Sequence, residues 1–179
     1  MMSMKIFALF FAALLGISTA VYADTPGEVP VGGTLRETTL HGLEGPDRKF
    51  SDYRGKPLII NVWASWCGPC RSEMASLNRL AQRYNGNQFF IIGISTDDDG
   101  AAAANAVRKE KLSFSNYLDS HVLLENMLGA DTIPLTVLVD ANGRVLDKVR
   151  GAHAWDSPDY VKAIGETFGI RLPRSSGGK

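Results

Sequence analysis

Residues 66–70 read Trp-Cys-Gly-Pro-Cys and contain both cysteines of the 179-residue chain. A run of apolar residues at 58–63 precedes this stretch, and an amphipathic segment follows it from residue 71. This order indicates a buried strand, a Cys-x-x-Cys turn and a helix. A dithiol at a helix N-terminus suits thiol–disulfide exchange, because the free N–H groups and the helix dipole favour the reactive thiolate.

The five residues of this stretch have different expected roles. Cys67 comes first and is the expected attacking sulfur, and Cys70, one helical turn further on, is the expected resolving sulfur. Gly68 permits close approach of a partner chain, and Pro69 fits the first helical turn without an N–H. Trp66 is either a docking surface beside the sulfurs or a half-buried packing residue. We therefore expect substrate contacts from Trp66, Gly68 and Pro69.

Three other roles are chemically possible for the cysteine pair. A structural disulfide would close a loop too short to add much stability. A zinc site needs about four ligands. The histidines, at positions 41, 121 and 153, are not spaced from the cysteines as in zinc-binding motifs, so no metal site is predicted. Copper(I) can use two thiolates, which keeps a copper-carrying thiol protein as an alternative.

Composition indicates one domain and argues against nucleic acid as a partner. The chain is 45% hydrophobic, enough for one substantial core. Lysine plus arginine equals aspartate plus glutamate at 19 each, so no net field draws the protein to nucleic acid or to an anionic membrane.

The N-terminal residues have the pattern of an export signal. A short start with one lysine, an apolar run and small residues before position 23 predict a signal peptide over 1–23. An uncleaved anchor is the alternative, because residues 6–23 carry no charge and could just reach across a bilayer. Residues 24–33, rich in Pro and Gly, are the expected linker, 34–170 the folded domain and 171–179 a flexible tail.

Apolar periodicity and turn residues predict a mixed α/β order of elements. A hairpin is expected from 34–40 and 48–50, with a helical turn at 51–56. Further strands are expected at 58–63, 89–95, 112–114, 135–140 and 144–150, and helices at 69–84, 101–111, 121–128 and 158–168. The result is a mixed sheet with helices on both faces.

Two polar residues near the motif, Glu73 and Asn61, and the acidic segment at 97–99 are open to more than one interpretation. Glu73, three residues beyond Cys70, either shuttles a proton and raises the thiol pKa values or stabilises the helix dipole as an ordinary first-turn residue. Asn61 interrupts an apolar strand and should be hydrogen-bonded, since an unsatisfied amide costs ~1–3 kcal/mol. The aspartates at 97–99 favour a solvated loop that caps the next helix over a calcium loop.

Several segments resemble a known family in order and spacing. The chain resembles the TlpA/ResA-like branch of thioredoxin-fold thiol–disulfide oxidoreductases, within the AhpC/TSA- and Redoxin-related superfamily, over about residues 34–168. The matching segments are 52–57 (Asp-Tyr-Arg-Gly-Lys-Pro), 61–74, 93–97, 133–134 and 139–145. A lone Cys-x-x-Cys motif would be weak evidence for a family, but this combination of segments in this order is specific.

The resemblance implies a fold and roles for the open positions. It implies a thioredoxin-like fold with an N-terminal hairpin and a central αβ insertion at 97–128. Pro134 matches the family's cis-proline, which with Ile133 lies opposite the dithiol and pairs with the substrate strand. Glu73 matches the active-site glutamate. Asn61 stands where ordinary thioredoxins have a buried aspartate, so Glu73 would handle the proton.

The resemblance also implies a function. It points to a periplasmic protein-disulfide reductase, in cytochrome c maturation or cytochrome oxidase assembly, that is recharged by a membrane electron donor of the DsbD/CcdA type. We expect a monomer that acts on protein thiols and disulfides, with no cofactor beyond the Cys67–Cys70 disulfide. A disulfide-forming oxidase with the same chemistry in the opposite direction is the alternative.

Overall fold

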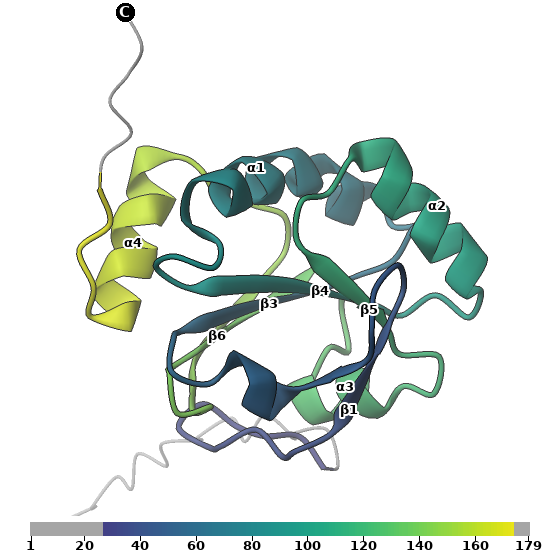
Figure 1. Cartoon of the computed structure of the whole chain (residues 1–179), viewed down its shortest axis with the longest axis horizontal. Coiled ribbons are helices and arrows are strands. Elements are labelled where there is room, and N and C mark those ends of the chain that lie inside the picture. Colours follow the sequence, from purple (N-terminus) through teal and green to yellow (C-terminus); the bar gives the residue numbers. More distant parts are fainter. Residues whose placement is uncertain (1–26, 174–179) are drawn as a thin grey trace, which may run out of the picture.

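A seven-stranded mixed sheet with helices on both faces forms the domain (Figure 1). The computed structural model describes residues 27–173. The strand order is β2-β1-β5-β4-β3-β6-β7. The strands are β1 (Thr39–Gly42), β2 (Arg48–Lys49), β3 (Leu58–Trp63), β4 (Phe90–Ser95), β5 (Ser115–Leu118), β6 (Leu135–Val139) and β7 (Val145–Arg150). The fold class expected from the sequence is confirmed.

Four helices cover the sheet within residues 27–173. They are α1 (Gly68–Tyr84), α2 (Gly100–Glu110), α3 (Leu123–Leu128) and α4 (Pro158–Phe168), and a 3-10 turn, η1, spans Phe50–Tyr53. Helices α1, α2 and α4 lie on one face, and α3 lies on the other (Figure 1). Asp99 caps α2 through the N–H of Ala101, at 2.8 Å, as predicted. Ser157 is the N-cap of α4, and its hydroxyl oxygen accepts from the N–H of Tyr160.

Strand β3 lies in the middle of the sheet and is buried on both faces. It runs parallel to β4 and antiparallel to β6. Side chains alternate along a strand: Ile60 and Val62 pack into the core under α3, whereas Ile59 and Trp63 pack against α1. This alternation turns Asn61 toward α1.

Two strands begin three or more residues later than the sequence predicted. The strand expected at 112–114 is β5, three residues further on. Leu112 instead donates to the carbonyl of Val107 as α2 ends. The buried Asn116 hid the strand, because its polar side chain interrupts the apolar pattern while bonding Trp63 and Phe114 inside the core.

The N-terminal hairpin is also shifted. Its first strand was expected at 34–40 but spans 39–42, since His41 and Gly42 pair with Leu118 and Tyr117 of β5. That pairing adds the hairpin to the edge of the main sheet. Helix α3 likewise begins at Leu123 rather than at residue 121.

The predicted signal peptide at 1–23 lies outside the described residues. The described part of the expected linker packs on the domain, where the N–H of Val29 donates to Met127 at 2.8 Å. At the other end Tyr84 donates to the carbonyl of Pro173 at 2.8 Å. No helix within residues 27–173 is long and apolar enough to cross a membrane.

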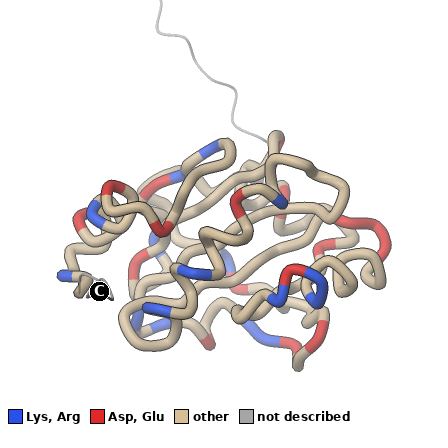
Figure 2. Tube along the Cα trace, turned by 90° about the horizontal axis from the view of Figure 1, so that it is seen from above, with Lys and Arg blue, Asp and Glu red and all other residues tan. Residues whose placement is uncertain are grey.

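Acidic and basic residues are interspersed along the trace (Figure 2). No single side of the described chain gathers one sign of charge in that view. This distribution agrees with the balanced composition of the whole chain.

Candidate active site

Cys67 and Cys70 form a disulfide where β3 leads into α1. Cys67 is the N-cap residue of α1, and its sulfur accepts from the N–H of Cys70 at 3.2 Å. Cys67 is 6% exposed and Cys70 fully buried. Because only Cys67 of the two reaches the surface, its sulfur is the one that a partner can approach.

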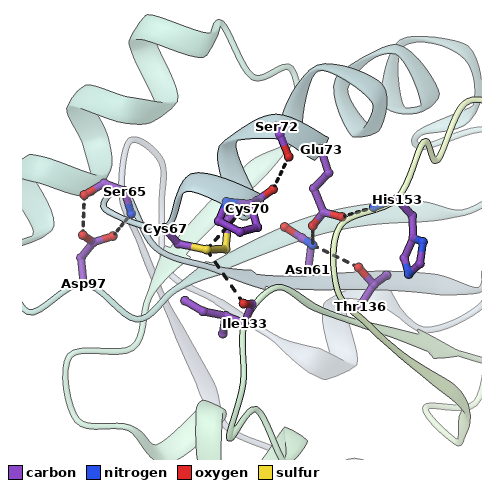
Figure 3. The surroundings of a disulfide bond; sticks show 11 residues. Asn61, Ser65, Cys67, Cys70, Ser72, Glu73, Asp97, Ile133, Thr136 and His153 are labelled. Carbon is purple, nitrogen blue, oxygen red and sulfur yellow. Dashed lines mark hydrogen bonds between the residues drawn. A yellow bond between two sulfur atoms is a disulfide. The ribbon is translucent and has the colours of Figure 1, made fainter.

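The peptide bond between Ile133 and Pro134 is cis, as the resemblance implied. It precedes β6 and faces the dithiol: the Ile133 carbonyl oxygen lies 4.0 Å from the sulfur of Cys67 (Figure 3). Antiparallel pairing of β6 with β3 brings the two segments together. A chain that approaches Cys67 therefore meets the backbone of Ile133 and Pro134.

The other expected substrate contacts surround Cys67 on the surface. Trp66 is 71% exposed, which excludes a half-buried packing role. Gly68 and Pro69 are exposed as well. A Cβ added at Gly68 would meet no atom within 4 Å, so the surface there is open. Exposed apolar groups thus border the reachable sulfur.

Glu73 is buried behind the dithiol, with 2% of its surface exposed. Its Oε1 accepts from Asn61 Nδ2 at 2.8 Å. Its Oε2 accepts from Trp155 Nε1 at 2.9 Å and from the backbone N–H of His153 at 3.1 Å. Glu73 is therefore a buried, three-fold hydrogen-bonded carboxylate rather than an exposed residue facing the helix dipole.

Burial raises the pKa of Glu73 above its usual value because it disfavours the charged form. The hydrogen bonds from Trp155, Asn61 and His153 act in the opposite direction and stabilise the carboxylate. The net result is a carboxyl group whose proton affinity is raised, one helical turn from Cys70. Such a group is suited to accept and return a proton.

Asn61 is hydrogen-bonded, as expected. Its Nδ2 donates to Glu73 and also to Thr136 Oγ1 at 3.0 Å. A carboxylate accepts and does not donate, so the amide nitrogen faces Glu73. Its Oδ1 is buried and finds no partner within the described part of the chain. In Figure 3 Asn61 lies between the disulfide and Glu73.

Asp97 is not in a solvated position, and the sequence-based interpretation was wrong for this residue. It is 3% exposed and accepts from Ser65 N at 2.9 Å and Ser65 Oγ at 2.6 Å (Figure 3). It also accepts from Ser95 Oγ at 2.6 Å. The parallel register of β3 and β4 brings the two strand ends together. Asp97 thereby anchors the loop that leads into the dithiol.

Sequence reasoning missed several residues of this site. Thr136, His153 and Trp155 contact Asn61 or Glu73 from segments far along the chain. The available signals were weak: Thr136 is the one polar residue of β6, and Trp155 is a single aromatic residue just before a helix cap. Within residues 27–173 no group of three or more His, Cys, Asp or Glu side chains could hold a metal ion.

Comparison with known proteins agrees with this geometry. A family model described as Redoxin matches residues 30–164. The thiol:disulfide interchange protein DsbE of Pseudomonas fluorescens is 33% identical over 150 residues, 80% of this chain and 81% of that protein. The thiol-disulfide oxidoreductase ResA of Geobacillus thermodenitrificans is 30% identical over 141 residues, 77% and 81% of the two chains.

Solved structures show the same fold. A crystal structure described as a DsbE protein from Chlorobium tepidum superimposes with a TM-score of 0.71 at 24% identity, covering 78% of this chain and 99% of that one. A secreted disulfide oxidoreductase of Mycobacterium tuberculosis gives a TM-score of 0.63 at 25% identity, with 73% and 96% covered.

Proposed function

Because this chain belongs to the Redoxin family and is a TlpA/ResA-like thiol–disulfide oxidoreductase, we propose that it acts as a protein-disulfide reductase outside the cytoplasm. The observation that carries the direction is the buried Glu73 carboxyl one turn from Cys70. A carboxylate near the two sulfurs disfavours their thiolate forms, so the reduced pair is less stabilised than it would be without that charge. A dithiol whose reduced form is weakly stabilised is a reductant, whereas a strong oxidant has a stabilised reduced form.

The catalytic cycle begins from the reduced pair. The Cys67 thiolate attacks one sulfur of a substrate disulfide, the substrate S–S bond breaks, and a mixed disulfide forms while the other substrate sulfur leaves as a thiolate that takes up a proton. Cys70 passes its proton to Glu73 and attacks Cys67, which releases the second substrate thiolate. The substrate gains two electrons, and the Cys67–Cys70 disulfide seen in the structure remains.

The surroundings of Cys67 fit a polypeptide substrate. Trp66, the chain neighbour of Cys67, is exposed, and the backbone carbonyl oxygen of Ile133 lies 4.0 Å from the Cys67 sulfur. An extended substrate segment would pair with that backbone, as the resemblance implies, and its cysteine would reach Cys67. We propose that the dithiol carries the electrons without a bound cofactor and that the protein works as a monomer.

The predicted signal peptide and the relatives support the location. The chain is 33% identical to a DsbE protein, and it shares its fold with a secreted mycobacterial oxidoreductase. An exported reductase needs a source of electrons, which we assign to a membrane donor of the DsbD/CcdA type. Cytochrome c maturation and cytochrome oxidase assembly are the processes in which we place its substrates.

The redox potential tests the direction. We expect a value well below about −200 mV for the Cys67–Cys70 couple, in the range of reductants. Equilibration with dithiothreitol buffers, followed by thiol alkylation and mass spectrometry, measures it. A potential near about −120 mV would identify a disulfide-forming oxidase instead.

Glu73→Gln should lower the pKa of at least one cysteine in the reduced protein, by about 1 unit, because it removes a negative charge near the thiols. Thiolate absorbance or the pH dependence of alkylation measures this. Glu166→Gln, an exposed carboxylate on α4, is the matched control. Unchanged titration of both sulfurs would remove Glu73 from the mechanism.

The same variant should flatten the pH dependence of stability. Burial raises the folded-state pKa of Glu73, so the folded chain binds this proton more tightly than the unfolded chain. The contribution of this carboxyl group is thus present at low pH and lost as the pH rises through the folded-state pKa. Urea unfolding across that range should show a smaller loss for Glu73→Gln.

A further inference from the structure

The loop between β7 and α4 supplies two of the three hydrogen bonds that Glu73 receives. Both bonds reach Oε2, from the backbone N–H of His153 and from the indole N–H of Trp155. The third, from Asn61, reaches Oε1. Of the two loop donors, only the one on Trp155 belongs to a side chain, so it is the one that a substitution can remove.

Trp155 is held rigidly at this position. It is 1% exposed, and its ring meets Tyr160 edge-on with centroids 5.1 Å apart. Its backbone N–H donates to Ser76 Oγ at 3.1 Å, and the same hydroxyl lies 3.1 Å from the carbonyl oxygen of His153. The loop therefore docks on α1 twice, through Glu73 and, one turn further, through Ser76.

A second contact fixes the loop where α4 begins. Arg79 of α1 makes a two-point ion pair with Asp156, at 2.6 and 3.0 Å. The indole of Trp155 is thus oriented by anchors on both sides in sequence. Its alignment with Oε2 is set by the docking of the whole loop rather than by the side chain alone.

We propose that Trp155 is a positioning residue for the proton step: its indole N–H orients the Glu73 carboxylate and stabilises its ionised form, so that Glu73 can take a proton from Cys70. The proposal rests on the proton-handling role of Glu73 in the proposed function. Burial alone raises the pKa of Glu73 and favours the protonated form, which cannot accept a proton. A hydrogen bond from a neutral donor to a buried carboxylate is among the stronger ones in proteins, which is why losing a single donor matters.

The groups that face Glu73 are few. Asn61 of β3 and Thr136 of β6 do not titrate, and Cys70 lies on the same helix. His153 is the titratable neighbour in the loop. Its Nε2 lies 3.1 Å from the Arg150 carbonyl, which can only accept, so Nδ1 of the neutral ring accepts from the hydroxyl of Tyr160 on α4. A test must therefore separate Glu73 from His153.

Trp155→Phe in the full chain provides the test, because it keeps an aromatic ring and removes the N–H. We expect the pKa of Glu73 to rise by about 1 unit, a tenfold change in proton binding. The pH profile of the single-turnover rate of disulfide reduction should move upward by the same amount, and in steady-state assays kcat should change while KM stays the same. Tyr160→Phe is the matched control: it removes the hydrogen bond to His153, keeps all three donors to Glu73, and should leave the profile in place.

Two further variants keep the proposal falsifiable. Ser76→Ala loosens the same loop with the indole intact and should shift the profile in the same direction, which covers the case in which Trp155→Phe does not fold. In a Glu73→Gln background, Trp155→Phe should cause no additional shift. The proposal would be overturned if the pH profile stayed unmoved in both Trp155→Phe and Ser76→Ala, or if Tyr160→Phe shifted it equally.

The same variants distinguish the proton-handling role of Glu73 from the positioning role of Trp155. If Glu73→Gln leaves the thiol titration unchanged, the proton role of Glu73 is wrong. If Glu73→Gln changes the thiol titration but neither Trp155→Phe nor Ser76→Ala moves the pH profile, only the role of Trp155 is wrong.

Discussion

Cys67→Ala is expected to abolish disulfide reduction, with a loss on the order of 10³-fold or more, because it removes the nucleophile. Cys70 cannot replace it, since Cys70 is fully buried whereas Cys67 reaches the surface. Insulin reduction in the presence of dithiothreitol, followed by turbidity, measures the activity. Single-turnover reduction of a disulfide peptide should show the same loss of activity, and it needs no recycling reductant.

A second variant separates chemistry from folding. The sulfur of Cys67 also caps α1 by accepting from the N–H of Cys70. Alanine removes that acceptor, and loss of an N-cap costs about 1 kcal/mol. Cys67→Ser keeps an acceptor oxygen, so it should fold as stably as the reduced wild type and still be inactive. Full activity in either variant would contradict the mechanism.

Cys70→Ala should trap the mixed disulfide between Cys67 and its substrate. Without the resolving sulfur the intermediate has no intramolecular exit, and uncatalysed disulfide rearrangement takes minutes to hours. A non-reducing gel and intact mass should show a one-to-one adduct with a disulfide peptide. The wild type, which resolves the adduct, should accumulate none.

The trap depends on Cys67 alone. The double variant Cys67→Ala with Cys70→Ala should form no adduct, and Glu73→Gln in the Cys70→Ala background should still form one, because Glu73 is assigned to the later proton transfer. If the Cys70 variant forms no adduct while Cys67 remains reactive toward alkylation, the resolving role of Cys70 is wrong.

Local patterns in the sequence located the elements that carry the dithiol. The apolar run of β3, the motif itself and the helix of α1 are defined by residues within one short stretch. The helix caps at Asp99 and Ser157 are equally local, because a capping side chain bonds an N–H two or three residues away. The resemblance added the cis bond at Pro134, which the structure contains.

Strand β5 is an element that local sequence patterns do not locate. Its Asn116 is polar yet buried, because the indole N–H of Trp63 donates to its side chain across the sheet. No periodicity reveals such a partner. The N-terminal hairpin shifted for the same reason, since its register follows its pairing with β5.

The sequence by itself determined the chemistry of this protein: a reactive dithiol at a helix start, in an α/β fold, with an acid one turn away. Only the tertiary structure decided the environment of that acid. Glu73 is buried because β3 and the loop after β7 enclose it, and its donors come from Asn61 and from residues 153–155. Burial and hydrogen bonding set a carboxyl pKa, and both depend on groups that are far apart in the chain and meet only when the sheet and loops are assembled.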